Sequence, residues 1–387
     1  MYKIKTFNNI SDKGLSRLPS TDYDINPDHE TPDAIILRSY KLHDYPVPDS
    51  LVAVGRAGAG TNNVPVVKMS EQGIPVFNAP GANANAVKEL VIAGMLLSCR
   101  NICQAWDYAR NVEGTAEEQS RAVEDGKKKY VGYELPGRTL GVVGLGAIGV
   151  YVANAAIALG MRVIGFDPTI TVKSAWKMSS EVQEMPTIDE LIKQSDFVTF
   201  HVPMLESTKN LLNAKRIENM KNGAVVLNFA RDGVVDDDAV LKALDDGKLG
   251  AYVCDFPAQN LKGHSKVIAL PHLGASTAEA EENCAIMVAD QLKDFLENGN
   301  IHNSVNFPEI RLARIGDVRL AIANKNLPDM VGQISHVLGQ AGVNIQHMSN
   351  ESRGDLAYTL MDLDKAIDEN ALSQIKAIEG VLSARQI

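Results

Sequence analysis

Three polar residues suited to proton or charge chemistry each follow an apolar stretch in the second half of the sequence. They are His201 in FHVP, Arg231 in NFARDG and His272 in PHLGAST. If these stretches are parallel strands, the side chains lie near the ligand crevice at the strand ends. Hydride transfer between a hydroxy acid and a nicotinamide needs a cation for the carboxylate and a group that exchanges the hydroxyl proton, and Arg231 and His272 are of these types. Taken alone, either histidine could instead be a structural or surface residue.

A glycine-rich segment precedes these residues. GVVGLGAIG places Gly144, Gly146 and Gly149 in G-x-G-x-x-G spacing, after an apolar strand and before a helix-like stretch. This arrangement gives a tight turn, close approach of the backbone to a pyrophosphate, and an anion site at a helix start. The next strand ends at Asp167, whose carboxylate can accept hydrogen bonds from ribose hydroxyls, which favours NAD over NADP. The alternatives are a glycine turn without a ligand and, for Asp167, a turn residue before Pro168.

The surrounding pattern predicts an α/β protein. Short apolar runs alternate with helix-like stretches over residues 33–78, and six further apolar runs between 139 and 274 suggest a doubly wound sheet. Residues 88–109 predict one long buried helix that joins two lobes, and 114–138 a loop. A helix-like stretch at 278–299 is expected to cross back toward the first lobe.

After a linker around Pro308, the order strand–helix–strand–strand–helix–strand describes a small ferredoxin-like domain.

Composition restricts the class of protein. The chain of 387 residues carries a net charge of −10, and nucleic-acid binding normally needs a basic face, so no such partner is predicted.

No apolar run is long enough to span a membrane and the amino terminus lacks a signal-peptide core, so neither membrane nor secretion is indicated. Four sparse cysteines suit a reducing compartment, and we expect the cytoplasm. A CxxxC metal site at Cys99 and Cys103 is the alternative to reduced thiols; no histidine or acidic cluster accompanies it, and no metal is predicted.

At the motifs above, the chain resembles the D-isomer-specific 2-hydroxyacid dehydrogenases. The matching segments are GLGAIG with Asp167, HVP at 201–203, NFARDGVVD at 228–236 and PHLGAST at 271–277. The resemblance implies a Rossmann-type doubly wound nucleotide domain inserted into a flavodoxin-like substrate domain, followed by a ferredoxin-like ACT domain. The implied bounds are 1–96 with 285–308 for the substrate-binding domain, 97–284 for the NAD-binding domain and 315–387 for the ACT-like domain.

The resemblance also implies roles for individual residues. Arg231 would bind and orient the substrate, and His272 would be the acid–base group, which the family pairs with a glutamate. The residues expected to contact NAD are Gly144, Gly146, Ala147, Ile148, Gly149, Asp167, His201, Pro203, Ala230, Arg231, Asp255, His272, Gly274 and Ala275.

Other segments are similar to family members that act on a phosphorylated hydroxy acid. These are ILRSY, VGRAGAGTNNV, IPVFNAPGAN and NFPE. They imply that Arg38 and Arg56 help to hold a substrate phosphate, which suits the guanidinium fork, while backbone amides near Ala57, Gly58 and Ala59 bind the carboxylate. The alternative is a pair of surface arginines in ordinary salt bridges.

The pattern departs from the family at one catalytic position. The family reads D-V-F-x-x-E where this chain reads C-D-F-P-A-Q, which places Gln259 at the glutamate and Cys254 at the aspartate. Asp255 could still reach the nicotinamide carboxamide, although neighbouring strand residues point to opposite faces. Gln259 could orient His272 through its amide oxygen, be replaced by an acid from elsewhere, or mark a slow or inactive enzyme. We predict a working enzyme in which Gln259 orients His272.

The C-terminal segment is similar to serine-binding ACT domains, in which Asn326 and Asn344 match effector contacts. Serine is the candidate effector, and an ACT domain used only for assembly is the alternative. We expect a homo-oligomer, a dimer or tetramer. The predicted function is NAD-dependent oxidation of a small phosphorylated D-2-hydroxy acid. The competing hypotheses are a dehydrogenase of another D-2-hydroxy acid and a catalytically weak NAD(H)-sensing binding protein.

Overall fold

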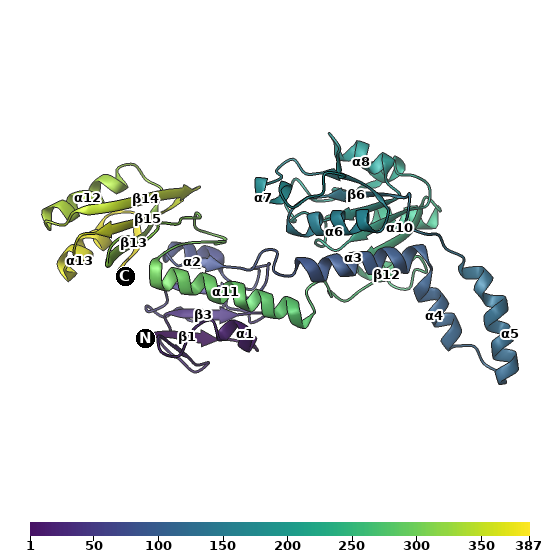
Figure 1. Cartoon of the computed structure of the whole chain (residues 1–387), viewed down its shortest axis with the longest axis horizontal. Coiled ribbons are helices and arrows are strands. Elements are labelled where there is room, and N and C mark those ends of the chain that lie inside the picture. The colour runs from purple at the N-terminus through teal and green to yellow at the C-terminus, as the bar shows by residue number, and fades with distance from the viewer. The chain divides into compact units, whose positions relative to one another are not determined.

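The computed structural model describes all of residues 1–387, and these divide into two compact units (Figure 1). Unit 1 contains residues 1–83 and 278–387, and unit 2 contains residues 84–277. The chain therefore leaves unit 1 once, builds unit 2 and returns. No helix is long and apolar enough to cross a membrane.

The first part of unit 1 is a parallel sheet with helices on both faces. Its strand order is β2-β1-β3-β4-β5, which is the flavodoxin-like order. Successive residues of β3 face opposite sides, so Ala34 and Ile36 enter one apolar core with α11 while Ile35 and Leu37 enter another. The elements are β1 (Tyr2–Thr6), α1 (Asp12–Leu15), β2 (Tyr23–Ile25), β3 (Ala34–Leu37), β4 (Ala53–Arg56), α2 (Val66–Glu71), β5 (Val76–Phe77) and α11 (Ala278–Asn298).

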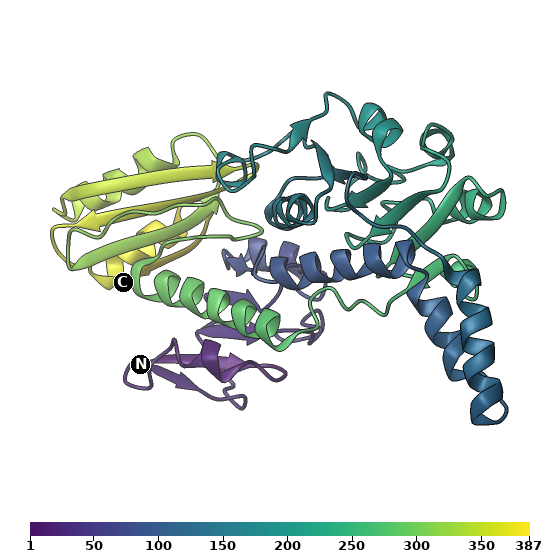
Figure 2. The same ribbon diagram turned by 45° about the vertical axis from the view of Figure 1, so that its right-hand side comes forward.

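The second part of unit 1 is a four-stranded antiparallel sheet in the order β14-β15-β13-β16, the ferredoxin-like arrangement expected for an ACT-like domain (Figure 2). One face packs on the two helices, and the other places Tyr358 and Leu360 in the same core as Phe295 of α11. The two parts of unit 1 thus share one hydrophobic core. The elements are β13 (Val318–Lys325), α12 (Met330–Gln340), β14 (Ile345–Arg353), β15 (Leu356–Leu363), α13 (Glu369–Ala377) and β16 (Val381–Gln386).

A buried ion pair fixes this sheet to the end of α11. Arg319 and Asp362 are both fully buried and form a bidentate pair with N–O distances of 2.6 and 3.0 Å. Burial alone would raise the pKa of Asp362, but hydrogen bonds from Arg319 and from the Ile315 amide outweigh it and hold that pKa below its ordinary value. The third guanidinium nitrogen of Arg319 donates a hydrogen bond to the carbonyl of Asn298, the last residue of α11.

Unit 2 is a seven-stranded parallel sheet in the order β12-β11-β10-β9-β6-β7-β8, with apolar cores on both faces. The order reverses between β6 and β9, and this reversal marks the switch point where a doubly wound sheet binds its ligand. The predicted fold class is confirmed. The elements are α3 (Ala84–Cys99), α4 (Ile102–Arg110), α5 (Ala116–Gly126), η1 (Lys127–Tyr130), β6 (Thr139–Val143), α6 (Ala147–Ala158), β7 (Arg162–Phe166), α7 (Val172–Ala175), β8 (Gln183–Glu184), α8 (Ile188–Gln194), β9 (Phe197–Phe200), α9 (Ala214–Glu218), β10 (Ala224–Asn228), α10 (Asp237–Asp245), β11 (Leu249–Cys254), η2 (Gln259–Leu261) and β12 (Val267–Ala269).

Two local predictions are wrong. Residues 88–109 do not form one buried helix: α3 ends at Cys99, Asn101 adopts the left-handed conformation (φ 51°), and the following α4 buries no residue. The predicted loop at 114–138 contains α5, which begins at a capping box between Thr115 and Glu118. The T-x-x-E spacing was the available signal for this helix start.

Candidate active site and nucleotide site

Two of the three motif glycines of unit 2 are required for steric reasons, and the third leaves open space at the start of α6. Gly144 has φ +91°, and a Cβ there would lie 2.6 Å from the carbonyl oxygen of His201. A Cβ on Gly149 would lie 1.9 Å from the carbonyl oxygen of Gly144. A Cβ on Gly146, the N-cap of α6, would meet nothing within 4 Å. The backbone at Gly146 is therefore open to a bound group, and the N-terminus of α6 offers amide donors to an anion.

Asp167 follows β7 and is held against the glycine turn. One carboxylate oxygen accepts from the Leu145 amide at 2.8 Å, and the other accepts from the Thr169 amide at 2.9 Å. The second oxygen also accepts from the Thr169 hydroxyl at 3.2 Å, so the first oxygen, with one of its two lone pairs unused, is the one that can still accept a ribose hydroxyl. The side chain thus connects the glycine turn to the expected ribose position.

His201 follows β9, and its environment excludes a role as proton carrier. Burial lowers the pKa of His201 to about 3, so the ring stays neutral at ordinary working pH. Its Nε2 lies 3.0 Å from the Thr199 hydroxyl, whereas Nδ1 is buried and has no hydrogen-bond partner within the protein. A buried polar atom without a partner is costly, and the backbone of His201 adjoins the glycine turn, since a Cβ on Gly144 would lie 2.6 Å from the His201 carbonyl oxygen. The residues present therefore fit a dinucleotide.

Arg231 follows β10 and presents an exposed guanidinium. The buried side chain of Asn228 fixes this turn because its amide donates to the Arg231 carbonyl at 3.0 Å and its oxygen accepts from the Ala230 amide at 3.2 Å. The Arg231 side chain donates one hydrogen bond within the protein, to the neighbouring Ala230 carbonyl at 2.7 Å. The positive charge is thus available to an anionic substrate.

His272 lies in the loop after β12 and is exposed, with the left-handed backbone conformation (φ 56°). Asp255, only 1% exposed, holds this loop: its two oxygens accept from the amides of Leu273 (2.7 Å) and Gly274 (2.8 Å). The Asp255 carbonyl also accepts from the His272 amide at 3.1 Å. Burial raises the pKa of Asp255, although these amides and the charge of His272 oppose the shift. Asp255, proposed from sequence to contact the cofactor, therefore has both oxygens engaged by the His272 loop.

The structure places Gln259 in an exposed position at the start of η2. No hydrogen bond joins its side chain to His272, whose ring instead packs on Phe256 with centroids 4.5 Å apart. Cys254, at the family's aspartate position, is fully buried, and burial raises its pKa to about 12. Cys254 is therefore a neutral core residue.

The remaining predicted cofactor contacts lie along the same edge of the sheet, because the strands of unit 2 are all parallel. They are Ala147 and Ile148 in the first turn of α6, Pro203 after β9, Ala230 after β10, and Gly274 and Ala275 after β12.

The predicted substrate-binding residues of unit 1 cluster after β3 and β4. The Arg56 Nε donates to the carbonyl of Arg38 at 3.1 Å, so the two arginines are neighbours. Arg38 also pairs with Glu281 of α11 at 2.6 Å. The amides of Ala57 and Gly58 already donate to the carbonyls of Leu37 and Arg56. Of the three amides predicted to bind the substrate carboxylate, the Ala59 amide is therefore the one left to do so.

Asp237 is a perturbed carboxyl that sequence reasoning missed. Burial raises the pKa of Asp237 to about 6; the Tyr252 hydroxyl, 3.2 Å away, opposes the shift, and neighbouring aspartates add to it. Because the folded pKa exceeds the ordinary value of 3.8, the native state favours the protonated form, so stability falls as the pH rises from about 4 to about 6 and the full cost is present above that range.

We expect Asp237→Asn to stabilise the protein by about 1 kcal/mol at pH 8 and to have little effect at pH 4. The value at pH 8 is smaller than the pKa shift alone would give, because the carboxyl group is only half-buried and solvent screens its charge. Chemical unfolding at both pH values measures this. The exposed Asp246→Asn serves as control, and an equal gain at both pH values would contradict the assignment.

Taken together, the glycine turn, Asp167, His201, and the strand-end arginine and histidine define an NAD-binding dehydrogenase domain. The family model for the NAD-binding domain of D-isomer-specific 2-hydroxyacid dehydrogenases matches residues 92–274.

The comparisons with known proteins extend over most of the chain. It is 35% identical over 347 residues to the D-3-phosphoglycerate dehydrogenase of Haemophilus influenzae, covering 87% of this chain and 81% of that protein. It is 34% identical over 350 residues to the Escherichia coli protein of the same name, covering 87% and 82%. The chain therefore belongs to the D-isomer-specific 2-hydroxyacid dehydrogenase family and is an NAD-dependent dehydrogenase.

Solved structures agree on the fold. D-2-hydroxyisocaproate dehydrogenase matches with a TM-score of 0.64 at 21% identity, covering 79% of this chain and 99% of that one. The NAD+-bound 3-phosphoglycerate dehydrogenase of Entamoeba histolytica matches with a TM-score of 0.60 at 23% identity, covering 79% and 98%. At these identities the structures establish the architecture alone.

Proposed function

We propose that the chain catalyses NAD-dependent oxidation of 3-phospho-D-glycerate to 3-phosphooxypyruvate, the first step of phosphorylated L-serine biosynthesis. The names of the relatives support this substrate. The structural observation that supports it is that the Arg56 side chain lies against the backbone of Arg38, so two arginines are available at one place, and a guanidinium fork suits a phosphate.

In this proposal each residue has one task. Arg231 holds the substrate carboxylate and polarises the carbonyl that forms, and His272 takes the proton from the hydroxyl. His201 cannot replace His272, because burial lowers its pKa to about 3. Bound NAD accepts the hydride. The glycine turn, Asp167 and His201 would hold it at the strand ends.

A substrate panel tests the proposal. NADH absorbance is followed with 3-phospho-D-glycerate, D-glycerate and D-lactate, and in reverse with the keto acids. We expect the phosphorylated substrate to give the highest kcat/KM, and Arg38→Gln to raise its KM about 10- to 100-fold without changing the KM for NAD. Preference for an unphosphorylated acid would support another D-2-hydroxy acid dehydrogenase. Absence of turnover with intact NAD binding would support the sensor hypothesis.

Gln259 remains proposed as a neutral group that orients His272, which requires η2 to approach the histidine when the site is filled. A carboxylate near a histidine raises the histidine pKa by about one to three units. We therefore expect Gln259→Glu to move the acid limb of the pH–rate profile for hydroxy-acid oxidation to higher pH. Gln259→Leu, which keeps the size but not the amide, should lower kcat without moving that limb. An unchanged profile in Gln259→Glu would remove the orienting role.

We further propose a homo-oligomer, a dimer or tetramer, built in part through α4 and α5. These helices extend away from the rest of unit 2 as a hairpin (Figure 2). Trp106 is 62% exposed and Val123 40% exposed, an unusual amount of apolar surface on a projecting arm. Light scattering of the native protein and of Trp106→Glu would test this surface.

We also propose that serine binds the ACT-like domain, and the positions of Asn326 and Asn344 restrict how such a site can be built. Asn326 lies near the Gly354 end of the antiparallel sheet, where its side chain donates to the Gly354 carbonyl, and Asn344 lies near Asp364 at the other end. The eight-residue strand β15 runs from one end to the other, roughly 25 Å. A site that uses both asparagines therefore needs two copies of the chain. Serine titration without inhibition or a thermal shift would count against regulation.

A further inference from the structure

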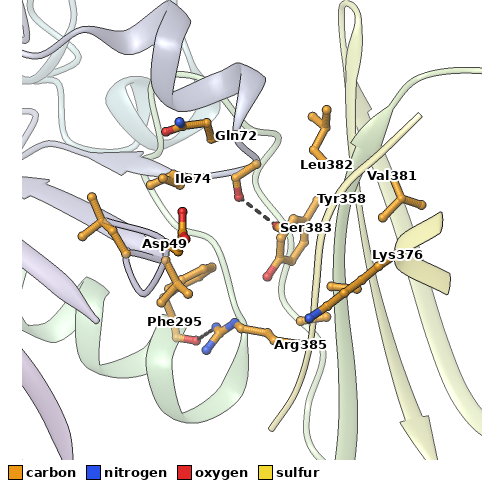
Figure 3. A pocket seen from close by; sticks show the side chains of 15 residues that line it. Asp49, Gln72, Ile74, Phe295, Tyr358, Lys376, Val381, Leu382, Ser383 and Arg385 are labelled. Atoms are coloured by element: carbon orange, nitrogen blue, oxygen red, sulfur yellow. Dashed lines mark hydrogen bonds between the residues drawn. The ribbon is translucent and has the colours of Figure 1, made fainter. Parts of the chain in front are cut away.

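A cavity of about 410 Å³ lies within unit 1, between the antiparallel sheet and the parallel-sheet part (Figure 3). One wall comes from β13, β15 and β16 with Lys376 of α13. The opposite wall comes from the segment before β4, the turn between α2 and β5, and Phe295 of α11. Its volume is in the range of small-molecule pockets. None of its lining residues belongs to the nucleotide site or the candidate active site.

Specific contacts hold the two walls of this cavity together. The Ser383 hydroxyl donates to the Gly73 carbonyl at 3.1 Å. Arg385 donates to the carbonyls of Phe295 and Leu296, and its guanidinium lies 4.2 Å from the centre of the Phe295 ring. Because both walls also contribute to one hydrophobic core, the cavity is a fixed feature of unit 1.

Two cationic side chains line the cavity. Lys376 and Arg385 come from the wall that contains β16, and the Arg385 guanidinium reaches across to the Phe295 carbonyl (Figure 3). Neither forms an ion pair within the protein, and the acceptors of Arg385 are neutral carbonyls. The only carboxylate in the lining is that of Asp49, an exposed residue of the opposite wall. In a chain of net charge −10, a cavity lined by two cations outside any ion pair and by one carboxylate is a local exception that favours an anion.

The rest of the lining contains both polar and apolar groups. Leu51, Phe295 and Tyr358 line the cavity but are each at most 4% exposed, so each presents only a small apolar edge to it. Burial raises the pKa of Tyr358, so its hydroxyl remains protonated and can donate a hydrogen bond. Apolar edges and a hydroxyl beside two cations match a small molecule with a short carbon skeleton and a negative group.

We propose that this cavity binds a small carboxylate-bearing metabolite, with the carboxylate at Lys376 and Arg385 and the carbon skeleton against Phe295 and Tyr358. Such a ligand contacts both walls, so it stabilises the association of the ACT-like sheet with α11 and with the α2–β5 turn. Since α11 also presents Glu281 to Arg38, this contact links the cavity to the proposed phosphate-binding residues.

Thermal unfolding and calorimetry of the full chain test the proposal with butyrate and succinate as probes, against chloride at equal ionic strength. We expect both carboxylates to raise the unfolding midpoint in a concentration-dependent way. Lys376→Gln should raise their Kd about tenfold, because Lys376 is exposed and makes no contact whose loss would unfold the protein. Lys365→Gln, the same charge change on an exposed lysine outside the lining, is the matched control and should leave Kd unchanged.

Three outcomes would overturn the proposal. The first is absence of any carboxylate-specific shift. The second is a shift of equal size in the native chain and Lys376→Gln, which would place the anion elsewhere, for example at Arg231. The third is weaker binding in Asp49→Asn, since removal of a nearby negative charge must leave the affinity for a plain anion unchanged or increase it. Inorganic phosphate is run in parallel, and a preference for it would contradict the carboxylate assignment.

Discussion

His272→Asn is expected to lower kcat by about 10²- to 10⁴-fold while the Kd for NADH stays within about threefold of the native value. The reason is that His272 is exposed at the strand ends, whereas burial lowers the pKa of His201 to about 3 and keeps that ring neutral. Asparagine fits this position because it tolerates the left-handed conformation that His272 adopts (φ 56°). Single-turnover measurements of NADH formation separate the chemical step from binding.

His201→Asn provides the comparison for this prediction. Because the backbone of His201 adjoins the glycine turn and its buried Nδ1 lacks a partner, its replacement should weaken NADH binding more than it lowers kcat at saturating cofactor. Equal loss of kcat in both variants would contradict the division of roles between the two histidines.

Asp255→Asn is expected to lower kcat about 10- to 100-fold through the position of His272. The carboxylate accepts hydrogen bonds from the amides of Leu273 and Gly274, and an asparagine can satisfy only one of them while its NH₂ group faces the other. Loss of a charge-assisted hydrogen bond costs about 1.5–3 kcal/mol, and 1.36 kcal/mol corresponds to a tenfold change in rate. Asp255 is thus a positioning residue.

The kinetic parameters distinguish this role from the cofactor contact proposed from the sequence. If the Asp255 carboxylate only fixes the loop, kcat falls while the Kd for NADH changes little. If it holds the nicotinamide carboxamide, the Kd for NADH rises at least tenfold. Asp255→Val leaves both loop amides without acceptors, so it should lower kcat further than Asp255→Asn; a smaller effect would contradict the positioning role.

Local motifs predicted the nucleotide site because its requirements are local. The glycine spacing and Asp167 follow from the geometry of one strand, one turn and one helix, and the structure gives Gly144 and Gly149 a steric reason and leaves open space at Gly146. The doubly wound sheet was predictable for the same reason, since buried parallel strands appear as continuous apolar runs.

The sequence failed where periodicity is ambiguous. Residues 88–109 are apolar enough for one buried helix, but the left-handed Asn101 ends α3, and α4 leaves Trp106 exposed. Hydropathy does not distinguish an apolar helix packed on its own unit from one that projects from it.

The amino-acid order alone therefore determined the fold class, the NAD turn and the residue types able to perform hydroxy-acid oxidation. Tertiary structure decided which of those residues are available. Burial keeps His201 neutral, and the Asp255 carboxylate accepts a hydrogen bond from the His272 loop. Arg231 is exposed, and Lys376 and Arg385, which are apart in the sequence, line one cavity. Burial and long-range hydrogen bonding depend on segments far apart in the chain, so no local pattern encodes them.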